Sequence, residues 1–439
     1  MLELSVSSII EILNAHSSMA SLLAMFTPFV LLLELPFQLM VIFGIFIWSK
    51  NQRKLSQYPK KFPKVTCTLL CYSEADEIIL PIKSLVHQLY PGEIEILVVV
   101  DGAIQNKDTY KIAMDVKKSL NDIPNRTIRV VPKWQRGGRV SSMNAGMQLA
   151  TGKIFMALDG DTTFENDMVI KAVGNFDDPN VVALAGNLRV RNKDTSLVTK
   201  LQNIEYMLSI GAGRTGLSTF NMVNNISGAF GIFRIEILKL LKGWDNGTAE
   251  DFDITMRLKE HFGRNPHWKI AFDPHVVGHT EVPDTFFGFF QQRMRWEGDL
   301  FYILIRKFMN NIRPTLIGGL NYVFTIIGVY FFQIVMPFVI TIYSIIMIIF
   351  LPLEYVISIM LIVYIIYFAI LLFIYITYIL LISDRVKEDL SYIIYLPFFL
   401  LFTYAARVNA AIALLHSIVN KSHLDSNMAP WWVLKKGHY

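Results

Sequence analysis

The stretch Ile94-Glu95-Ile96-Leu97-Val98-Val99-Val100-Asp101-Gly102 is a largely apolar run that ends on an acid followed by a glycine. Runs of this kind are typical of parallel strands that are covered on both faces. Helical stretches fall between such runs, for example Lys107 to Leu120 and Arg139 to Ala150. This alternation predicts an α/β fold with a doubly wound, mostly parallel sheet that binds ligands at the carboxyl ends of its strands. The other predicted strands are Val65 to Cys71, Thr127 to Val131, Ile154 to Leu158 and Val181 to Ala185.

The composition indicates a membrane protein with a large polar part. The 439 residues are enough for two or three domains. Hydrophobic residues make up 53% of the chain and charged residues 18%, and the mean hydropathy of +0.40 is too high for a purely soluble protein. The net charge of +5 fits contact with anionic headgroups or nucleotide phosphates. Because the excess charge is dispersed, we expect no nucleic-acid partner.

The two cysteines are expected to be reduced and buried on the cytoplasmic side. Cys67 and Cys71 lie in one predicted strand, four residues apart. An extended chain holds such residues about 13 Å apart, which is beyond the reach of a disulfide.

Four apolar stretches are long enough to cross a bilayer, which takes about 20 residues. The first is interrupted by Pro28, Glu34 and Pro36, and the segment before it has no basic residue, so we expect no cleavable signal peptide. Six basic residues follow the first stretch, and by the positive-inside rule they predict that the next, polar block is cytoplasmic. These six are Lys50, Arg53, Lys54, Lys60, Lys61 and Lys64; the four stretches are Leu22 to Trp48, Leu316 to Leu351, Tyr355 to Ser383 and Tyr392 to Val419.

The number of crossings stays open in the sequence. The Leu316 stretch is too long for one comfortable span and tight for two, with Pro337 as a candidate break. Three C-terminal crossings would place the basic tail, with Lys421, Lys435 and Lys436, outside, against the charge rule.

Two predicted strands end on acids. Asp101 before Gly102 closes a strand, where the alternatives are an Asx-turn and a carboxylate at the ligand-binding edge. In Asp159-Gly160-Asp161 the two acids point the same way in extended backbone, so their carboxylates converge. Hard divalent cations bound with phosphate substrates prefer such an oxygen pair, although a polar turn would also use it. Two acidic strand ends in one sheet favour a functional site.

Two further motifs begin predicted helices. Thr248-Ala249-Glu250-Asp251 reads as a capping box with Thr248 as N-cap and Asp251 at the third position, or as a general base at a helix start. The two roles are compatible, because an acid at a helix N-terminus stays ionised. Gly137-Gly138-Arg139 gives another helix start a flexible backbone and a cation, which suits a diphosphate. Asn187, Arg189 and Arg191 alternate after a strand, and a solvated edge strand would explain them.

Two cationic motifs lie at or within the membrane. Gln292-Arg293-Met294-Arg295-Trp296 sits at the seam between the polar block and the apolar stretches. An interfacial amphipathic helix explains this run, and such a helix can still present Arg295 and Trp296 inward. Arg407, near Tyr404 and Asn409, lies inside the last apolar stretch and indicates either a polar transport path or a snorkelling side chain.

Taken together, these motifs resemble the processive membrane-embedded family 2 glycosyltransferases, which include the cellulose, hyaluronan, chitin-oligosaccharide and poly-N-acetylglucosamine synthases. The resemblance covers about residues 60 to 310 and the membrane layout. Within that family the chain looks most like the bacterial poly-N-acetylglucosamine synthases. The similar stretches are Ala185 to Asn192, Lys200 to Tyr206, Ile226-Ser227-Gly228 and Val282-Pro283-Asp284-Thr285.

The resemblance implies a role for each motif. Asp101 would recognise the uridine, flanked by Tyr72 and Glu74, and Arg139 would lie near the diphosphate, where the family usually has a lysine. Asp159 would contact the nucleotide sugar, and Asp161, with Asp159, would bind Mg²⁺ or Mn²⁺. Asp251, with Glu250 beside it, would deprotonate the acceptor hydroxyl for a single inverting displacement. The remaining substrate-binding residues implied are Ser227, Gly228, Gln292, Arg295 and Trp296.

The implied protein is a multi-pass enzyme of the cell (inner or plasma) membrane. It would transfer sugar from a UDP-sugar, by the resemblance first of all UDP-N-acetylglucosamine, to a growing β-linked polysaccharide. It would also move the polymer outward across the membrane. Its partners would be the donor, the polymer, the bilayer and a small accessory membrane subunit. The expected parts are membrane segments at 1–49, a cytoplasmic GT-A-type nucleotide-sugar transferase domain at 60–284, interfacial helices at 285–312, transmembrane helices at 313–420 and a basic tail at 421–439.

Departures from the family pattern leave the sugar open between N-acetylglucosamine, hyaluronan, cellulose and other exopolysaccharides. Ser73 replaces the usual asparagine, Glu297-Gly298-Asp299 follows Trp296, and the tail carries Trp431-Trp432. Two rivals remain: a non-processive transferase with a lipid-phosphate acceptor, a class that generally lacks the Gln292 to Trp296 run, and a transporter or receptor whose α/β block only senses nucleotide.

Overall fold

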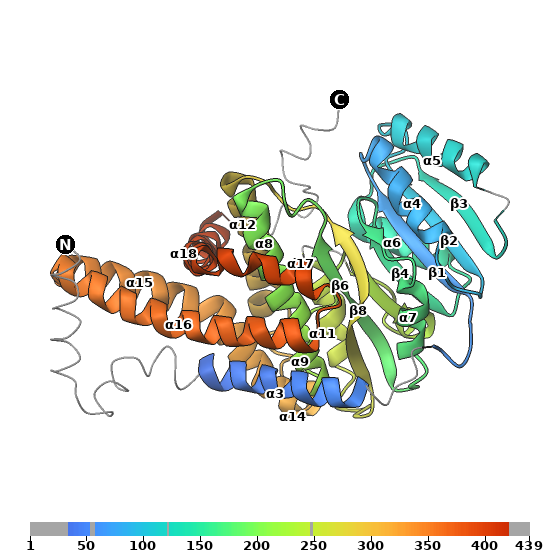
Figure 1. Cartoon of the computed structure of the whole chain (residues 1–439). Coiled ribbons are helices and arrows are strands. Elements are labelled where there is room, and N and C mark those ends of the chain that lie inside the picture. Colours follow the sequence, from blue (N-terminus) through green and yellow to red (C-terminus); the bar gives the residue numbers. More distant parts are fainter. Residues whose placement is uncertain (1–33, 53–57, 121–122, 246–248, 421–439) are drawn as a thin grey trace.

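The computed structural model describes residues 34–52, 58–120, 123–245 and 249–420 (Figure 1). Thr248, Trp431, Trp432, the tail lysines and residues 22–33 of the first apolar stretch lie outside these residues. An eight-stranded sheet forms the centre of the polar part, in the order β3-β2-β1-β4-β7-β6-β8-β5. Its strands are β1 (Val65–Cys71), β2 (Ile94–Asp101), β3 (Arg126–Lys133), β4 (Ile154–Asp159), β5 (Thr163–Phe164), β6 (Val181–Val190), β7 (Phe230–Arg234) and β8 (Lys269–Thr280).

The first four strands pair in parallel, as the apolar runs predict. β1 and β2 are buried at every residue, because helices cover both faces of this half of the sheet. The covering helices and turns are η2 (Ala75–Ile78), α4 (Ile79–Val86), α5 (Lys107–Ser119), α6 (Gly138–Leu149), α7 (Met168–Asn175) and α10 (Ile235–Leu240). The predicted α/β fold with a mostly parallel sheet is therefore confirmed, and the strand and helix bounds agree within a few residues.

The second half of the sheet contains antiparallel pairs that the apolar runs do not reveal. β7 lies between β4 and β6 and runs antiparallel to both, and β5 runs antiparallel to β8. β6 is thus an inner strand, and Asn187 on it is buried. The interpretation of Asn187, Arg189 and Arg191 as a solvated edge strand is wrong, since β8 pairs with β6 along this stretch.

A group of helices joins the sheet to the apolar segments. These are α8 (Leu197–Glu205), the π-helix η3 (Tyr206–Gly213), α9 (Arg214–Thr219), α11 (Glu250–Lys259), α12 (Phe286–Phe301) and the π-helix η4 (Tyr302–Lys307). They share one hydrophobic core with α3 (Leu35–Gln52) and the C-terminal helices. Gly44 of α3 and Gly216 of α9 lie so close that a Cβ on either would meet the other helix's backbone at 2.3 Å. The membrane segments are therefore packed directly onto the polar block.

Within the described residues, three helices are long and apolar enough to cross a membrane: Gly319–Phe350, Leu353–Leu381 and Val386–Val419. The long stretch from Leu316 forms one such helix, and Pro337 follows a π-helical section without ending it. Figure 1 shows α15 and α16 running side by side away from the sheet. The elements of this part are α13 (Pro314–Ile317), α14 (Gly319–Phe324), η5 (Thr325–Val335), α15 (Met336–Phe350), α16 (Leu353–Leu381), α17 (Val386–Ser391), η6 (Tyr392–Tyr395) and α18 (Leu396–Asn420).

Candidate active site

The Asp159-Gly160-Asp161 motif lies at the carboxyl end of β4, where β1 also ends. The backbone passes so close to β1 that a Cβ at Gly160 would come within 2.7 Å of the Leu70 carbonyl oxygen, so only glycine fits between the two acids. Burial, and then the neighbouring charge of Asp159, raise the pKa of Asp161 to about 6. The predicted convergence of these two carboxylates is therefore present.

Arg139 brings two acidic motifs together. It lies in the first turn of α6, and its Nη1 is 2.5 Å from Asp159 Oδ1 while its Nε is 2.6 Å from Glu250 Oε1. Burial lowers the pKa of Arg139, but the charges of Asp159 and Glu250 outweigh it and hold the pKa above its usual value. The guanidinium is thus a fixed cation between the strand end and the start of α11.

Asp251 lies at the N-terminus of α11, beside Glu250. Its Oδ2 accepts hydrogen bonds from Asn225 Nδ2 at 3.0 Å and from the Gly228 amide at 3.3 Å, and its Oδ1 accepts from the amide of Phe252 at 2.8 Å. The N-cap is Ala249, so Asp251 is the second helical residue rather than the third, and the capping-box interpretation is wrong in that respect. These three hydrogen bonds orient the carboxylate.

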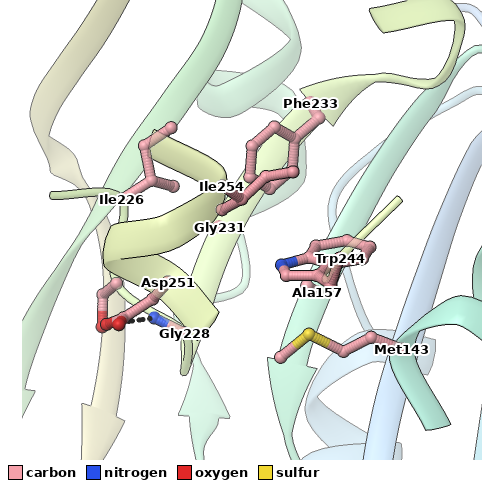
Figure 2. Close-up of a pocket in the computed structure, with 10 residues that line it drawn as sticks. Met143, Ala157, Ile226, Gly228, Gly231, Phe233, Trp244, Asp251 and Ile254 are labelled. Atoms are coloured by element: carbon pink, nitrogen blue, oxygen red, sulfur yellow. Dashed lines mark hydrogen bonds between the residues drawn. The ribbon is translucent and has the colours of Figure 1, made fainter. Parts of the chain in front are cut away.

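Ser227 and Gly228 belong to the wall behind Asp251. A Cβ at Gly228 would approach Glu250 Oε1 at 3.0 Å and Arg139 Nη2 at 3.2 Å, so a side chain there would press on the ion pair. Figure 2 shows a small cavity in this region, lined mainly by apolar side chains such as Trp244. Asp251 contributes to the lining of this cavity.

Asp101 has a different environment. Its Oδ1 accepts from Lys133 Nζ at 2.7 Å and from the Gly137 amide at 2.9 Å, and its Oδ2 accepts from the Gly138 amide at 2.9 Å. The side chain is only 7% exposed. In this structure Asp101 fixes the glycine turn that begins α6, where Gly138 has a φ of +78°. A direct contact with uridine stays a prediction.

Tyr72 and Glu74 lie in the loop after β1. Glu74 Oε2 accepts from the amide of Tyr72 at 2.6 Å. Burial raises the pKa of Glu74 to about 7, and the nearby charges of Asp161 and Asp159 act in the same direction. The guanidinium of Arg136 lies 4.3 Å from the centre of the Tyr72 ring, a contact that no sequence motif indicated.

The predicted interfacial helix is α12, which carries Gln292, Arg295 and Trp296. Arg293, not singled out from the sequence, pairs with Glu205 at 2.8 Å and stacks on the Trp296 ring at 4.5 Å. Gln292 Oε1 is buried without a hydrogen-bond partner, while Arg295 is exposed and the Trp296 side chain is 37% exposed. The three residues therefore differ in environment, and the amide oxygen of Gln292 is buried and unpaired.

A buried arginine and tyrosine lie between α12 and the acids. The charges of Arg293 and Asp161 both act on Tyr206, and those of Tyr206 and Asp251 both act on Arg214. Burial lowers the pKa of Arg214 to about 10, and its Nη1 lacks a hydrogen-bond partner. No sequence motif indicated Arg214, and Tyr206 was indicated only as the last residue of the Lys200 to Tyr206 stretch.

Arg407 points into the protein rather than snorkelling. Its Nη1 donates to the Phe332 carbonyl oxygen at 2.7 Å, within the π-helical section η5. Asn409 donates to the Phe290 carbonyl oxygen of α12 at 3.3 Å, and Tyr404 donates to Ser344 at 2.8 Å. A transport path through this polar interior stays a prediction.

The two carboxylates of the Asp159-Gly160-Asp161 motif are chemically suited to bind a hard divalent cation. Asp159 and Asp161 supply carboxylate oxygens, and Asp159 Oδ1 makes an ion pair but no well-aligned hydrogen bond. Burial is the main cause of the raised pKa of Asp161, and the neighbouring charge of Asp159 acts in the same direction. Among the described residues, no group of three or more His, Cys, Asp or Glu is arranged to hold a metal by itself.

Comparison with known proteins identifies the family. Residues 154–406, more than half of the chain, match the model of the glycosyl transferase family group 2. The chain belongs to this family. As a family 2 glycosyltransferase it is an enzyme, which excludes a nucleotide-sensing transporter or receptor as its class.

Relatives and a solved structure agree with this assignment. The chain is 30% identical over 250 residues to the poly-beta-1,6-N-acetyl-D-glucosamine synthase of Staphylococcus epidermidis and 29% identical over 250 residues to that of Staphylococcus aureus strain MSSA476. Each match spans 57% of this chain and 57% of the relative. The structure resembles the mannosyltransferase PcManGT from Pyrobaculum calidifontis, solved with GDP-Man and Mn²⁺, with a TM-score of 0.54 at 16% identity over 86% of this chain and 99% of that one. This likeness confirms the predicted GT-A-type fold.

Proposed function

We propose that this family 2 glycosyltransferase transfers N-acetylglucosamine from UDP-N-acetylglucosamine to a growing β-linked exopolysaccharide. The observation that carries the proposal is the convergence of Asp251, Arg139 and Asp159 in one site. The sugar is inferred from the printed names of the relatives, which match over just over half of their length.

In this proposal Asp251 removes the proton from the acceptor hydroxyl. The hydroxyl oxygen then attacks the anomeric carbon of the donor sugar, the bond from that carbon to the diphosphate oxygen breaks, and the configuration inverts. Two hydrogen bonds to Oδ2 orient the carboxylate for this step.

Arg139 lies where the leaving diphosphate gains charge. Its guanidinium is held by Asp159 and Glu250, so its position is fixed before the donor binds. Mg²⁺ or Mn²⁺ held by Asp159 and Asp161 would add Lewis-acid stabilisation of the same charge. Tyr72, Glu74 and Asp101 would form the nucleoside side of the site, and Gln292, Arg295 and Trp296 the acceptor side.

The membrane arrangement supports synthesis coupled to export. The three helices long enough to cross a membrane pack in one core with α12, so a polymer leaving the site meets them at once. Basic residues after the first apolar stretch support a cytoplasmic catalytic domain, where UDP-sugars are available. We infer a division into a catalytic part at 60–284, interfacial helices at 285–312 and membrane helices at 313–420.

The test is donor-dependent release of UDP by the purified full chain in lipid nanodiscs with Mn²⁺. UDP-N-acetylglucosamine, UDP-glucose and UDP-glucuronic acid are supplied one at a time, and any product is digested with linkage-specific hydrolases. We expect UDP release with UDP-N-acetylglucosamine and a product sensitive to a β-N-acetylglucosaminidase. Release with a different donor alone would overturn the sugar assignment, and a product of one added sugar would overturn processive synthesis.

A further inference from the structure

The turn between α16 and α18, residues 383–395, is tied to the catalytic sheet by charged side chains; we call it the membrane turn. Asp389 in this turn pairs with Arg189 of β6, and its side chain is 1% exposed. Ser383 Oγ donates to Asp389 Oδ2 at 2.6 Å, and the Tyr375 hydroxyl donates to the Asp389 carbonyl oxygen. A buried, paired carboxylate of this kind holds two segments in a defined register.

Further contacts surround this pair. Arg385 of the turn pairs with Glu165, which also accepts from His279 Nε2 at 2.7 Å. Additional links join Asp384 to His275, Glu388 to Lys193, and the Tyr392 hydroxyl to Asp194. The membrane turn therefore contacts residues of β6 and β8 and the residue that follows β5.

These contacts reach the loop of Asp159 and Asp161 through β5. This strand is only Thr163–Phe164, and Thr163 pairs with His279 of β8. Glu165 follows directly, so the Arg385–Glu165–His279 cluster fixes the end of β5 that points away from Asp161. On the other side, Arg191 Nη1 donates to the Asp161 carbonyl oxygen at 2.9 Å and pairs with Glu281.

A two-residue strand at the edge of a sheet has little stability of its own. β5 is the last strand in the sheet order and pairs only with β8 among the described strands. Few ladder hydrogen bonds hold it, so side-chain contacts decide how often it opens. One of those contacts, from Arg385 to Glu165, comes from the membrane turn, more than 200 residues later in the chain.

We propose that the membrane turn positions the carboxylates of Asp159 and Asp161 through β5, with Arg385 as a positioning residue. The inference rests on the proposed function for the role of those carboxylates. It differs from simple adhesion between the catalytic part and the membrane helices, because adhesion would not depend on the particular contact to Glu165.

The first experiment is hydrogen exchange on the full chain in nanodiscs, which needs no turnover. Arg385→Ala is compared with Lys387→Ala, a matched control that removes an exposed cation from the same turn. In Arg385→Ala we expect amides of residues 159–166 to exchange about threefold faster, the change that loss of a half-exposed ion pair predicts. Amides of β1 should be unchanged, which shows that the variant is folded. Equal exchange of residues 159–166 in the two variants would overturn the proposal.

The second experiment measures UDP release against Mn²⁺ concentration. A loosened loop should raise the half-saturating Mn²⁺ concentration by about threefold while kcat at saturating Mn²⁺ stays near wild type. Arg385→Lys, which keeps the charge, should restore the wild-type value, and Glu165→Gln should add little to Arg385→Ala. A lower kcat with unchanged Mn²⁺ dependence would overturn the positioning role. If the wild type releases no UDP, the proposed function fails, while the exchange experiment still decides the structural claim.

Discussion

Asp101 and Asp251 lie at the same edge of the catalytic part, but their surroundings differ. Around Asp101, one carboxylate meets Lys133 and two backbone amides, and both oxygens are used. Around Asp251, the acids Glu250, Asp159 and Asp161 crowd near Arg139, and burial together with mutual repulsion raises the pKa of Glu250 and Asp161.

From this difference we infer that Asp101 has a structural role, whereas the proposed chemistry depends on the acids around Asp251. Both oxygens of Asp101 already have hydrogen-bond partners within the protein, so this carboxylate can fix the shape of a loop. The Asp159–Asp251 region carries excess negative charge, which a metal ion, a diphosphate-bound cation or a proton from the acceptor can balance. We expect substitutions in the second region to change chemistry more than stability, and those in the first to do the reverse.

The largest effect should follow from Asp251→Asn. The amide cannot accept the proton of the acceptor hydroxyl, so kcat for transfer should fall by about a thousandfold. UDP-N-acetylglucosamine binding, measured by isothermal titration, should stay within about twofold of wild type. Glu236→Gln is the matched control, because Glu236 is an exposed acid in the first turn of another helix, α10. Retained polymer synthesis in Asp251→Asn would reduce Asp251 to a helix-capping residue.

Much of the Asp101 region and of the acidic strand end was predictable from the sequence. Apolar runs that end on Asp101 or Asp159 are local signals, and parallel strands bring their carboxyl ends to one edge. The register of β1 to β4 then places these acids near each other. The observed helix starts at Gly138 and Glu250 each lie within one residue of the starts that the local patterns predicted.

The contacts that complete the site were not predictable, because they join residues far apart in the chain. Arg189 meets Asp389 across 200 residues, and Arg293 meets Glu205 across 88. β7 gives no strong alternating signal and inserts antiparallel between β4 and β6. Arg214, at the start of α9, and Tyr206, at the start of η3, become relevant only because the fold brings Arg214 within electrostatic reach of both Asp251 and Tyr206.

Arg139→Ala should have the second-largest effect and tests the charge balance of the acidic region. Without the guanidinium, Asp159 and Glu250 face each other with no counter-charge, and the free energy of unfolding at pH 7 should fall by about 2 kcal/mol. The pKa of Glu250, already raised in the folded state, rises further. A group whose pKa is raised in the folded state stabilises the fold at low pH, and this stability is lost as pH increases. The loss of unfolding free energy in Arg139→Ala, relative to wild type, should therefore be smaller at pH 5 than at pH 7.

Thermal unfolding of Arg139→Ala at both pH values measures this change. Arg139→Lys provides the comparison, because one ammonium keeps the charge but cannot reach both acids with separate nitrogens. A deficit that is the same at pH 5 and pH 7 would show that packing, not charge, is lost.

Asp101→Asn tests the Asp101 region and should have a smaller effect on the rate of transfer. The amide keeps one acceptor oxygen but loses the charge that holds Lys133, which should cost about 1–2 kcal/mol of unfolding free energy. Because the glycine turn at Gly137 and Gly138 loosens, KM for the donor should rise while kcat changes little. Asp108→Asn, an exposed acid at the start of α5, is the control. A loss of kcat comparable to that of Asp251→Asn would erase the distinction between the two regions.

The smallest effect is expected for Lys259→Met. This substitution tests whether a buried charge affects stability at a place remote from the acidic site. Lys259 is the last residue of α11, is 1% exposed and lies 5.8 Å from the centre of the Phe324 ring. Burial alone lowers its pKa from 10.5 to about 7. The unfolded chain therefore holds this proton between pH 7 and 10.5 while the folded chain releases it, and stability rises with pH across that window. Methionine fills similar space without a charge, so Lys259→Met should raise the free energy of unfolding by about 1 kcal/mol at pH 7 and by less at pH 10.

Thermal unfolding of Lys259→Met at the two pH values tests this expectation. An equal gain in stability at both would mean that Lys259 is neutral or solvated throughout. Activity should be unchanged, because Lys259 lies at the opposite end of α11 from Asp251 and contacts Phe324 of α14.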